Sequence, residues 1–215
     1  MSGVEFASMS RDEMMKRASP DLALVELEDG QLIHHLRVGD LEALGVLYDR
    51  HGTVVLRTAL AITQDRCAAQ DIVQDVFLQL LKSIVIVDPS RPLRPWLYRV
   101  TINLCYSFHR RRTWSLISVD QVVNVLISPR LSPENEALER ESQEAVTAAM
   151  KELPWEQRVV VVLFYLNEIP VHEIAELLDC PEGTVKSRLY YSRRKLRKIL
   201  QGEEQLRLDI AYGIR

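Results

Sequence analysis

Apolar residues recur at intervals of three or four positions along almost the whole chain, whereas the strict alternation typical of a half-buried strand is rare. This spacing puts apolar side chains on one face of each helix, so it predicts an all-α fold. Two blocks show the pattern, residues 31–112 and 133–201. Gly, Pro and polar residues predict helix breaks at 39–40, 63–66, 87–95, 153–154, 167–170 and 180–183. The sequence therefore predicts two small helical domains.

The segments outside these blocks lack a sustained helical period. We expect a poorly ordered leader in residues 1–26, a flexible linker in residues 113–132 and a C-terminal tail in residues 202–215. The two domains are then expected to occupy residues 27–112 and 133–201.

No segment has the composition of a targeting or membrane-spanning element. Acidic residues are scattered through residues 1–30, and the longest apolar run, 159–166, is far shorter than the roughly 18 residues that a membrane span needs. Cys67, Cys105 and Cys180 are far apart and form no CxxC pair. We interpret them as buried thiols in a reducing cytoplasm and expect no membrane insertion.

The sequence contains no recognisable constellation of catalytic groups. The five histidines show no metal-ligand spacing such as HExxH, and no Gly-rich phosphate loop or Ser nucleophile motif is present. We therefore expect no catalytic residue, no bound metal and no cofactor, and the chain is not expected to be an enzyme.

The stretch "PVHEIAELLDCPEGTVKSRL" has the sequence form of a helix-turn-helix unit. Ile174, Leu177 and Leu178 form an apolar stripe, and a tight turn follows. Pro181 suits the first position of a helix, and Glu182 suits the positive end of its dipole. The second helix is therefore predicted to be a DNA-recognition helix.

That second helix concentrates seven Lys and Arg residues in a chain whose formal net charge is −3. Positive charge mixed with hydroxyls and aromatic rings suits phosphate contacts at the flanks and base-edge contacts in the centre. The predicted DNA contacts are Lys186, Ser187, Arg188, Tyr190, Tyr191 and Arg194. The alternative is a solvated cationic helix.

Several segments resemble a known family. Residues 29–52 ("DGQLIHHLRVGDLEALGVLYDRHG"), 68–84 ("AAQDIVQDVFLQLLKSI") and 94–112 ("RPWLYRVTINLCYSFHRRR") resemble region 2 of the sigma-70 family of RNA polymerase sigma factors, in particular the extracytoplasmic function (ECF) subfamily. Residues 153–196 resemble region 4. The resemblance implies a region 2 helical bundle and a region 4 helix-turn-helix joined by the linker.

The resemblance also implies a function and partners. A bacterial, cytoplasmic ECF sigma factor binds core RNA polymerase at the β′ clamp helices and the β flap and directs initiation at specific promoters. Region 4 recognises the minus-35 element of promoter DNA, and region 2 recognises and melts the minus-10 element. An anti-sigma factor is a further partner that the resemblance implies.

The helix at residues 69–82 carries one isolated apolar residue, Leu78, among carboxylates and amides. Such a residue is a plausible anchor for a protein partner, although a surface helix with one stray Leu is the alternative. The resemblance implies contact with the β′ clamp helices, by Asp71, Gln74, Asp75, Leu78 and Gln79.

The helix at residues 95–112 has a polar and increasingly basic side, which suits a single DNA strand. The resemblance implies a flipped minus-10 base in the preceding loop, residues 87–94. The predicted minus-10 contacts are Arg99, Asn103, Arg110, Arg111 and Arg112. Trp96 and Tyr98 are candidates for stacking on bases, with core packing favoured for Trp96.

The alternative function is a stand-alone helix-turn-helix transcription regulator, since response regulators also contain "GTVKxxL". Such proteins carry an α/β receiver domain, and the first 112 residues show no alternation of strands and helices. An adaptor protein would leave the basic helix unexplained.

Overall fold

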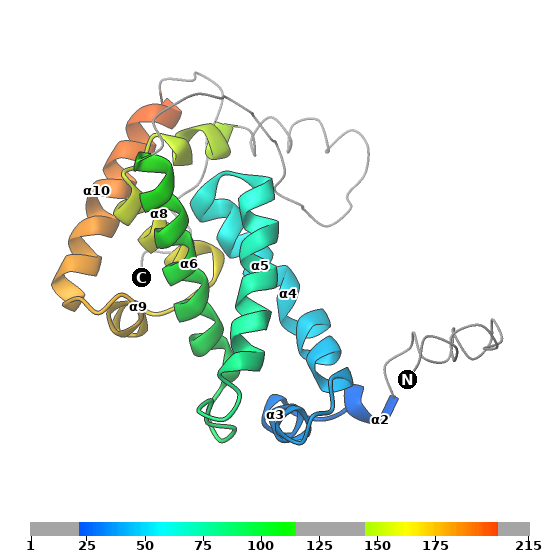
Figure 1. The fold of residues 1–215 in the computed structure, drawn as a ribbon. Coiled ribbons are helices and arrows are strands. Elements are labelled where there is room, and N and C mark those ends of the chain that lie inside the picture. The colour runs from blue at the N-terminus through cyan, green and yellow to red at the C-terminus, as the bar shows by residue number, and fades with distance from the viewer. Residues whose placement is uncertain (1–21, 115–144, 202–215) are drawn as a thin grey trace, which may run out of the picture.

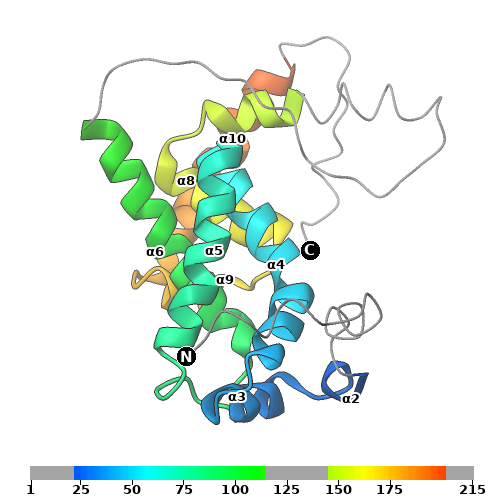
Figure 2. The same cartoon turned by 45° about the vertical axis from the view of Figure 1, so that its right-hand side comes forward.

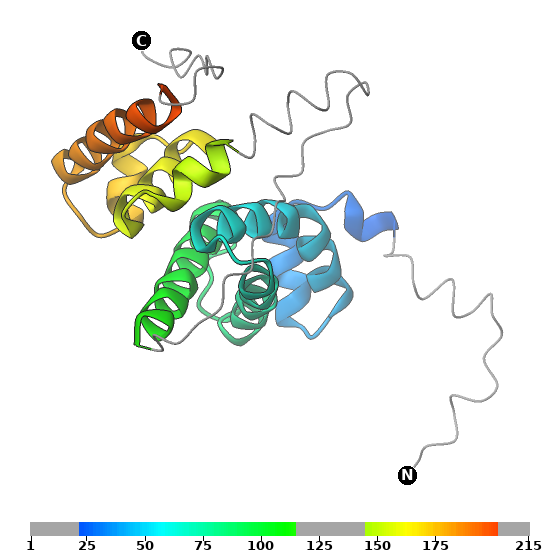
Figure 3. The same ribbon diagram turned by 90° about the horizontal axis from the view of Figure 1, so that it is seen from above.

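The computed structural model describes residues 22–114 and 145–201, which form helices and no strand (Figure 1). The predicted all-α, two-domain fold is confirmed. The front domain contains α2 (Leu22–Val25), α3 (Asp29–Arg37), α4 (Glu42–Thr63), α5 (Arg66–Lys82) and α6 (Leu93–Trp114). The rear domain contains helical residues 145–151, α8 (Trp155–Val161), the π-helix η2 (Val162–Leu166), α9 (Val171–Leu177) and α10 (Glu182–Gln201). Seen from above, the two groups of helices lie side by side (Figure 3).

Most of the predicted leader and linker, and all of the predicted tail, lie outside the described residues. The helix α2 is an exception, because it occupies the last part of the segment that we predicted to be a leader. Its Leu24 is buried, and the Val25 carbonyl accepts a hydrogen bond of 3.2 Å from Arg50 of α4. Folded structure is therefore present on the N-terminal side of residue 27.

The helix α4 lies at the centre of the front domain and packs against α3, α5 and α6 (Figure 2). Its fully buried apolar residues recur at helical spacing: Leu47, Val55, Ala59 and Ile62. They meet buried residues of α5 and α6 that include Val76, Leu80 and Leu97. Burying one large aliphatic side chain contributes about 1.5–3 kcal/mol, so this shared core is the main source of stability for the domain.

The break between α4 and α5 occurs where it was predicted. Gln64 adopts a left-handed conformation with φ of 57°, and its N–H donates to the Leu60 carbonyl at 2.8 Å, which ends α4. The Asp65 carboxylate then accepts a hydrogen bond of 3.0 Å from the Ala68 N–H and caps α5.

The helices α9 and α10 form the predicted helix-turn-helix. The turn between them contains Asp179, which has a left-handed φ of 49°, and the Cys180 N–H donates to the Ala175 carbonyl at 3.0 Å. Ile174 of α9 and Val185 of α10 are fully buried beside this turn. The turn thus sets the direction of α10 relative to α9.

The apolar run at 159–166 does not form one regular α-helix. It starts as α8 but continues as η2, in which the Asn167 N–H donates to the Val162 carbonyl at 3.2 Å, five residues earlier. A π-helical turn is rare and often accompanies a functional feature. Here it ends at Asn167, which contacts the front domain.

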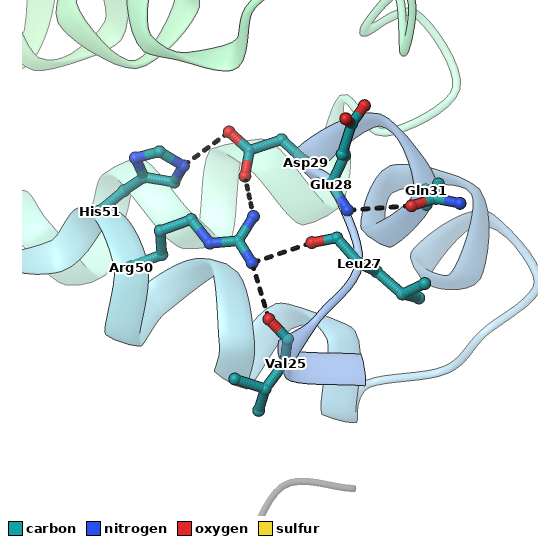
Figure 4. A network of polar contacts seen from close by, with 7 residues as sticks. All are labelled: Val25, Leu27, Glu28, Asp29, Gln31, Arg50 and His51. Carbon is teal, nitrogen blue, oxygen red and sulfur yellow. Dashed lines mark hydrogen bonds and ion pairs between the residues drawn. The ribbon is translucent and has the colours of Figure 1, made fainter. Parts of the chain in front are cut away.

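A partly exposed polar network fastens α3 to α4 (Figure 4). One oxygen of the Asp29 carboxylate lies 2.8 Å from Nε2 of His51, whose side chain is almost fully buried. The other oxygen accepts a hydrogen bond of 2.6 Å from Arg50, which also donates to the Leu27 carbonyl at 2.9 Å. Loss of a buried member would leave polar groups without partners.

Replacing His51 by Ala is expected to lower the free energy of unfolding by about 2–4 kcal/mol, because it opens a cavity and removes one partner of Asp29. The matched control is His35→Ala on α3, where an exposed His pairs with Asp40 at 3.1 Å. That change is expected to stay within about 0.5 kcal/mol. Urea denaturation followed by circular dichroism measures both values, and equal losses would contradict the prediction.

Several hydrogen bonds connect the front and rear domains. The Asn167 side-chain amide donates to the hydroxyl of Thr58, a buried residue of α4, at 2.9 Å. The Arg99 guanidinium of α6 donates to the Glu176 carbonyl of α9 at 2.9 Å. Helix α6 is thus held against the first helix of the helix-turn-helix.

Aromatic rings and a half-buried cation complete the contact between the domains. Trp155 of α8 stacks on His109 of α6 at 4.2 Å and meets Tyr106 edge-on at 5.8 Å. Arg158 of α8 donates to the Ile62 carbonyl of α4 at 3.0 Å. The same guanidinium donates to three carbonyls in, or just after, the last turn of the helix formed by residues 145–151. This one side chain therefore connects the two domains.

Candidate nucleic-acid interface and partner surface

The buried face of α10 decides which of its side chains reach solvent. Val185, Leu189 and Leu196 are buried on the side that packs against α8 and α9. Ser192 is also fully buried, and its hydroxyl donates to the Arg188 carbonyl at 2.6 Å. The opposite side of α10 therefore faces away from the protein.

Most of the predicted DNA contacts lie together on this exposed face: Lys186, Ser187, Tyr190, Tyr191 and Arg194. A shallow cationic hollow extends the face toward the start of α8 and is lined by Pro154, Gln157, Tyr191, Arg194, Lys195, Arg197 and Lys198. The predicted set ended at Arg194 and did not include Lys195, Arg197 and Lys198; of these, Lys195 donates to the Glu152 carbonyl. The sequence signal for including them was that basic residues continue along the same helix beyond Arg194.

The remaining predicted DNA contact, Arg188, does not share the exposed face. It is half-buried on the side toward α6, where burial raises the pKa of the Tyr106 phenol and the charge of Arg188 opposes that rise. Arg193 is also engaged, because its Nε donates to the Tyr165 hydroxyl at 2.6 Å and its guanidinium lies 5.7 Å from the Phe164 ring.

The exposed cation Lys186 has a partner that can be exchanged. Its ammonium donates to the Glu182 carboxylate at 2.7 Å, and this hydrogen bond and charge lower the pKa of Glu182. Both side chains are exposed, so water screens the pair and it contributes little to stability. The ammonium can therefore turn to a phosphate without a large loss.

The residues predicted to bind a protein partner all lie on the exposed face of α5: Asp71, Gln74, Asp75, Leu78 and Gln79. Leu78 is 49% exposed, whereas its apolar neighbours Val76 and Phe77 are buried. An exposed apolar residue bordered by carboxylates matches the anchor arrangement that the sequence predicted.

The interpretation of all three cysteines as buried thiols is wrong for Cys67, which is exposed on α5. It precedes the buried stripe of that helix by one residue, so its side chain falls on the solvent side. Cys180 is half-buried, and Cys105 is buried, which raises the pKa of its thiol to about 12.

The predicted minus-10 residues lie along α6. Asn103, Arg110, Arg111 and Arg112 are exposed. Arg112 lies 3.8 Å from the carboxylate of Asp65, the residue that caps α5. Arg99 is exposed as well, but its guanidinium is occupied by the hydrogen bond to the rear domain. The rear domain thus contacts one end of this surface.

The two aromatic candidates on α6 differ in position. Tyr98 is 6% exposed, and burial raises the pKa of its phenol, so the prediction that it could stack on bases is wrong. Its side chain falls on the buried face of α6 with Leu97. Trp96 is half-buried and packs against the core, as the sequence favoured.

Within residues 22–114 and 145–201, no group of three or more His, Cys, Asp or Glu side chains is arranged to hold a metal ion. None of the helices in this part of the chain is long and apolar enough to cross a membrane.

Two family models match the chain, one in each domain. The model of sigma-70 region 2 matches residues 47–115, and the model of sigma-70, region 4 matches residues 143–196. The second match contains the helix-turn-helix and its exposed cationic face, and the first contains the α5 and α6 surfaces.

Curated relatives cover most of the chain. It is 35% identical over 156 residues to the ECF RNA polymerase sigma factor SigL of Mycobacterium tuberculosis, a match that covers 72% of this chain and 87% of that protein. It is 30% identical over 193 residues to the probable RNA polymerase sigma factor RfaY of Xanthomonas campestris pv. campestris, which covers 86% of this chain. The match spans 48% of that second relative's length.

A solved structure has the same fold. The sigma factor RpoE of Bartonella quintana, in complex with the anti-sigma factor NepR, superposes with a TM-score of 0.58 and 20% sequence identity. The likeness covers 72% of this chain and 96% of that chain.

Proposed function

Because the chain belongs to the ECF subfamily of sigma-70 RNA polymerase sigma factors, which are initiation factors rather than enzymes, we propose that it directs core RNA polymerase to specific promoters. The rear domain reads the minus-35 element with α10. The front domain binds the polymerase with α5 and recognises and melts the minus-10 element with α6. In this proposal region 2 occupies residues 27–112 and region 4 occupies residues 133–201.

The observation that carries this proposal is the unbroken exposed face of α10. Lysines and arginines border two tyrosines and a serine there, while every large aliphatic residue of the helix is directed inward or half-buried. Arginine and lysine contact phosphates and read the edges of guanines, and aromatic rings pack against bases and sugars. A merely solvated helix would not need its rings exposed.

In vitro transcription with core RNA polymerase over a promoter library tests the proposal. The chain is expected to yield transcripts with defined start sites that are absent with core enzyme alone. A stand-alone regulator would instead bind its operator duplex without polymerase and would yield no such transcripts. Binding of the chain alone to duplex DNA, measured in parallel, separates the two functions.

Replacing Arg194 by Ala is expected to weaken binding of the polymerase complex to the minus-35 element about tenfold, because one charged contact with the duplex is lost. If the contact is to a phosphate, the slope of log affinity against log salt also falls by about 1. The control is Arg57→Ala, an exposed arginine of α4 away from the cationic face. Fluorescence anisotropy measures both, and equal effects would contradict the assignment.

We also propose a further partner and a compartment by analogy with the relatives. The Bartonella RpoE structure contains an anti-sigma factor, and we extend such a partner to this chain. Since its polymerase acts in the bacterial cytoplasm, we place the chain there as well.

Under this proposal, the two domains cannot keep their observed contact while they bind both promoter elements at once. The positions for which the two elements are named, minus-35 and minus-10, are about 25 base pairs apart. At 3.4 Å per base pair this is roughly 85 Å of B-DNA. Yet Arg99, on the proposed minus-10 surface, donates a hydrogen bond directly to α9 of the domain that we assign to the minus-35 element. The domains must therefore separate, and residues 115–144 could span roughly 100 Å if fully extended.

A further inference from the structure

Two large aliphatic side chains stand together in the loop between α5 and α6. Val85 and Ile86 are 79% and 81% exposed, whereas their neighbours Ile84 and Val87 are buried. We refer to Val85 and Ile86 as the aliphatic tip. Two adjacent aliphatic side chains that are this exposed form a small apolar patch, which makes the tip a candidate contact surface.

The backbone of this loop is held in place by one side chain of α3. The Arg37 guanidinium donates to the carbonyls of Ile84, Val85 and Val87, at 3.1, 3.3 and 2.7 Å. The Ile86 N–H donates to the Ser83 carbonyl at 2.9 Å, which closes the turn. The tip is therefore presented on a fixed turn, and Figure 1 shows this loop beside α3 at one end of the front domain.

A second contact fixes the other side of the loop. A Cβ atom built on Gly30 of α3 would lie only 2.3 Å from the Pro89 carbonyl oxygen, so the absence of a side chain at Gly30 permits the close approach. The Asp88 carboxylate also accepts hydrogen bonds from the Ser90 N–H and hydroxyl, at 3.0 and 2.7 Å. Both ends of the loop are thus anchored.

The basic residues that follow the tip in the chain favour nucleic acid as its partner. Arg91 and Arg94 are exposed, and Arg91 lies 3.4 Å from the carboxylate of Asp88 in the same loop. The exposed amide of Asn103 continues along α6. The exposed face of α5, which we assign to the polymerase, instead carries two carboxylates. A DNA strand would place its phosphates near the arginines and its bases near the tip.

We propose that Val85 and Ile86 form a wedge that enters the base stack at the minus-10 element as the duplex opens. This inference rests on the proposed function. Aliphatic side chains on rigid supports unstack neighbouring base pairs by occupying the space between them, and the opened strand then binds to the basic surface. The wedge acts on the stack itself and is separate from the flipped-base role that the resemblance implies for residues 87–94.

The double variant Val85→Ser, Ile86→Ser tests the wedge with the full chain and core polymerase. Permanganate reactivity of unpaired thymines reports opening on a duplex promoter and on the same promoter with a mismatched, already open minus-10 segment. We expect opening of the duplex to slow about tenfold and transcription from the open template to stay unchanged. The matched control, Val25→Ser, changes an exposed aliphatic residue of α2 and is expected to affect neither template.

A second variant tests the support without altering the tip. Arg37→Lys keeps the positive charge but cannot make all three carbonyl contacts, so it is expected to reproduce the duplex-specific defect in milder form. Opening of the duplex by the double variant at the wild-type rate would overturn the wedge. An equal loss on both templates would also overturn it and would assign the tip to the polymerase. Absence of transcripts with the wild-type chain on both templates would refute the proposed function itself.

Discussion

Replacing Leu78 by Glu is expected to lower the affinity for core RNA polymerase by at least about a hundredfold, because apolar anchors at the centre of an interface dominate its binding energy. The introduced carboxylate would also have to lose its water in the complex without a partner, next to Asp71 and Asp75. Titration of fluorescently labelled polymerase with the variant measures the affinity, and promoter-directed transcription should be lost in parallel.

The fold is expected to survive this change, since Leu78 is half-exposed and contributes little to the core. The matched control is Val25→Glu, which introduces the same charge at an aliphatic residue of similar exposure, 46%, on α2. Normal transcription from the Leu78 variant would refute the assignment of α5 as the polymerase-binding surface. Loss of activity in both variants would show that the added charge acts without regard to position.

Covalently joining the two domains is expected to abolish promoter-directed transcription. The hydroxyl of Thr58 and the amide of Asn167 are 2.9 Å apart, so the pair Thr58→Cys, Asn167→Cys places two thiols within reach of each other. Cys67 and Cys180 are replaced by Ser beforehand to prevent other disulfides. Oxidation should lower the yield of transcript at least about tenfold, because chains held closed cannot populate the open state, and reduction should restore it.

The single variant Thr58→Cys in the same background is the control, and its activity should not respond to oxidation. Gel mobility without reductant confirms that the intramolecular disulfide has formed. If the oxidised double variant supports transcription as well as its reduced form, the domains do not need to separate and the spatial argument is wrong.

Much of the fold could be predicted from local sequence, because each helix break coincides with residues that end or start helices. Asp65 caps α5 through its own carboxylate, and Pro181 stands just before α10. The α5 surface was also predictable, since an isolated Leu78 among polar residues on a helical wheel must face solvent if the other apolar residues face the core. Local patterns of this kind depend on a single helix.

The features that escaped prediction depend on how helices meet. Arg188 and Arg194 belong to the same basic run, yet Arg188 is half-buried because it faces α6, whereas Arg194 is exposed. Tyr98 could have faced either way until the packing of α6 placed it in the core. The contact between Thr58 and Asn167 joins residues 109 positions apart, which no local pattern could reveal.

Under the proposed function, the polar contact at Asn167 also affects how tightly promoters are bound. Only open molecules can occupy both promoter elements, so the apparent affinity of the factor–polymerase complex for a promoter equals its intrinsic affinity multiplied by the open fraction. Each 1.4 kcal/mol of added contact between the domains lowers it about tenfold. A substitution at Asn167, which lies outside the proposed α5 and α10 binding surfaces, would thus change promoter occupancy without altering a residue that contacts polymerase or DNA.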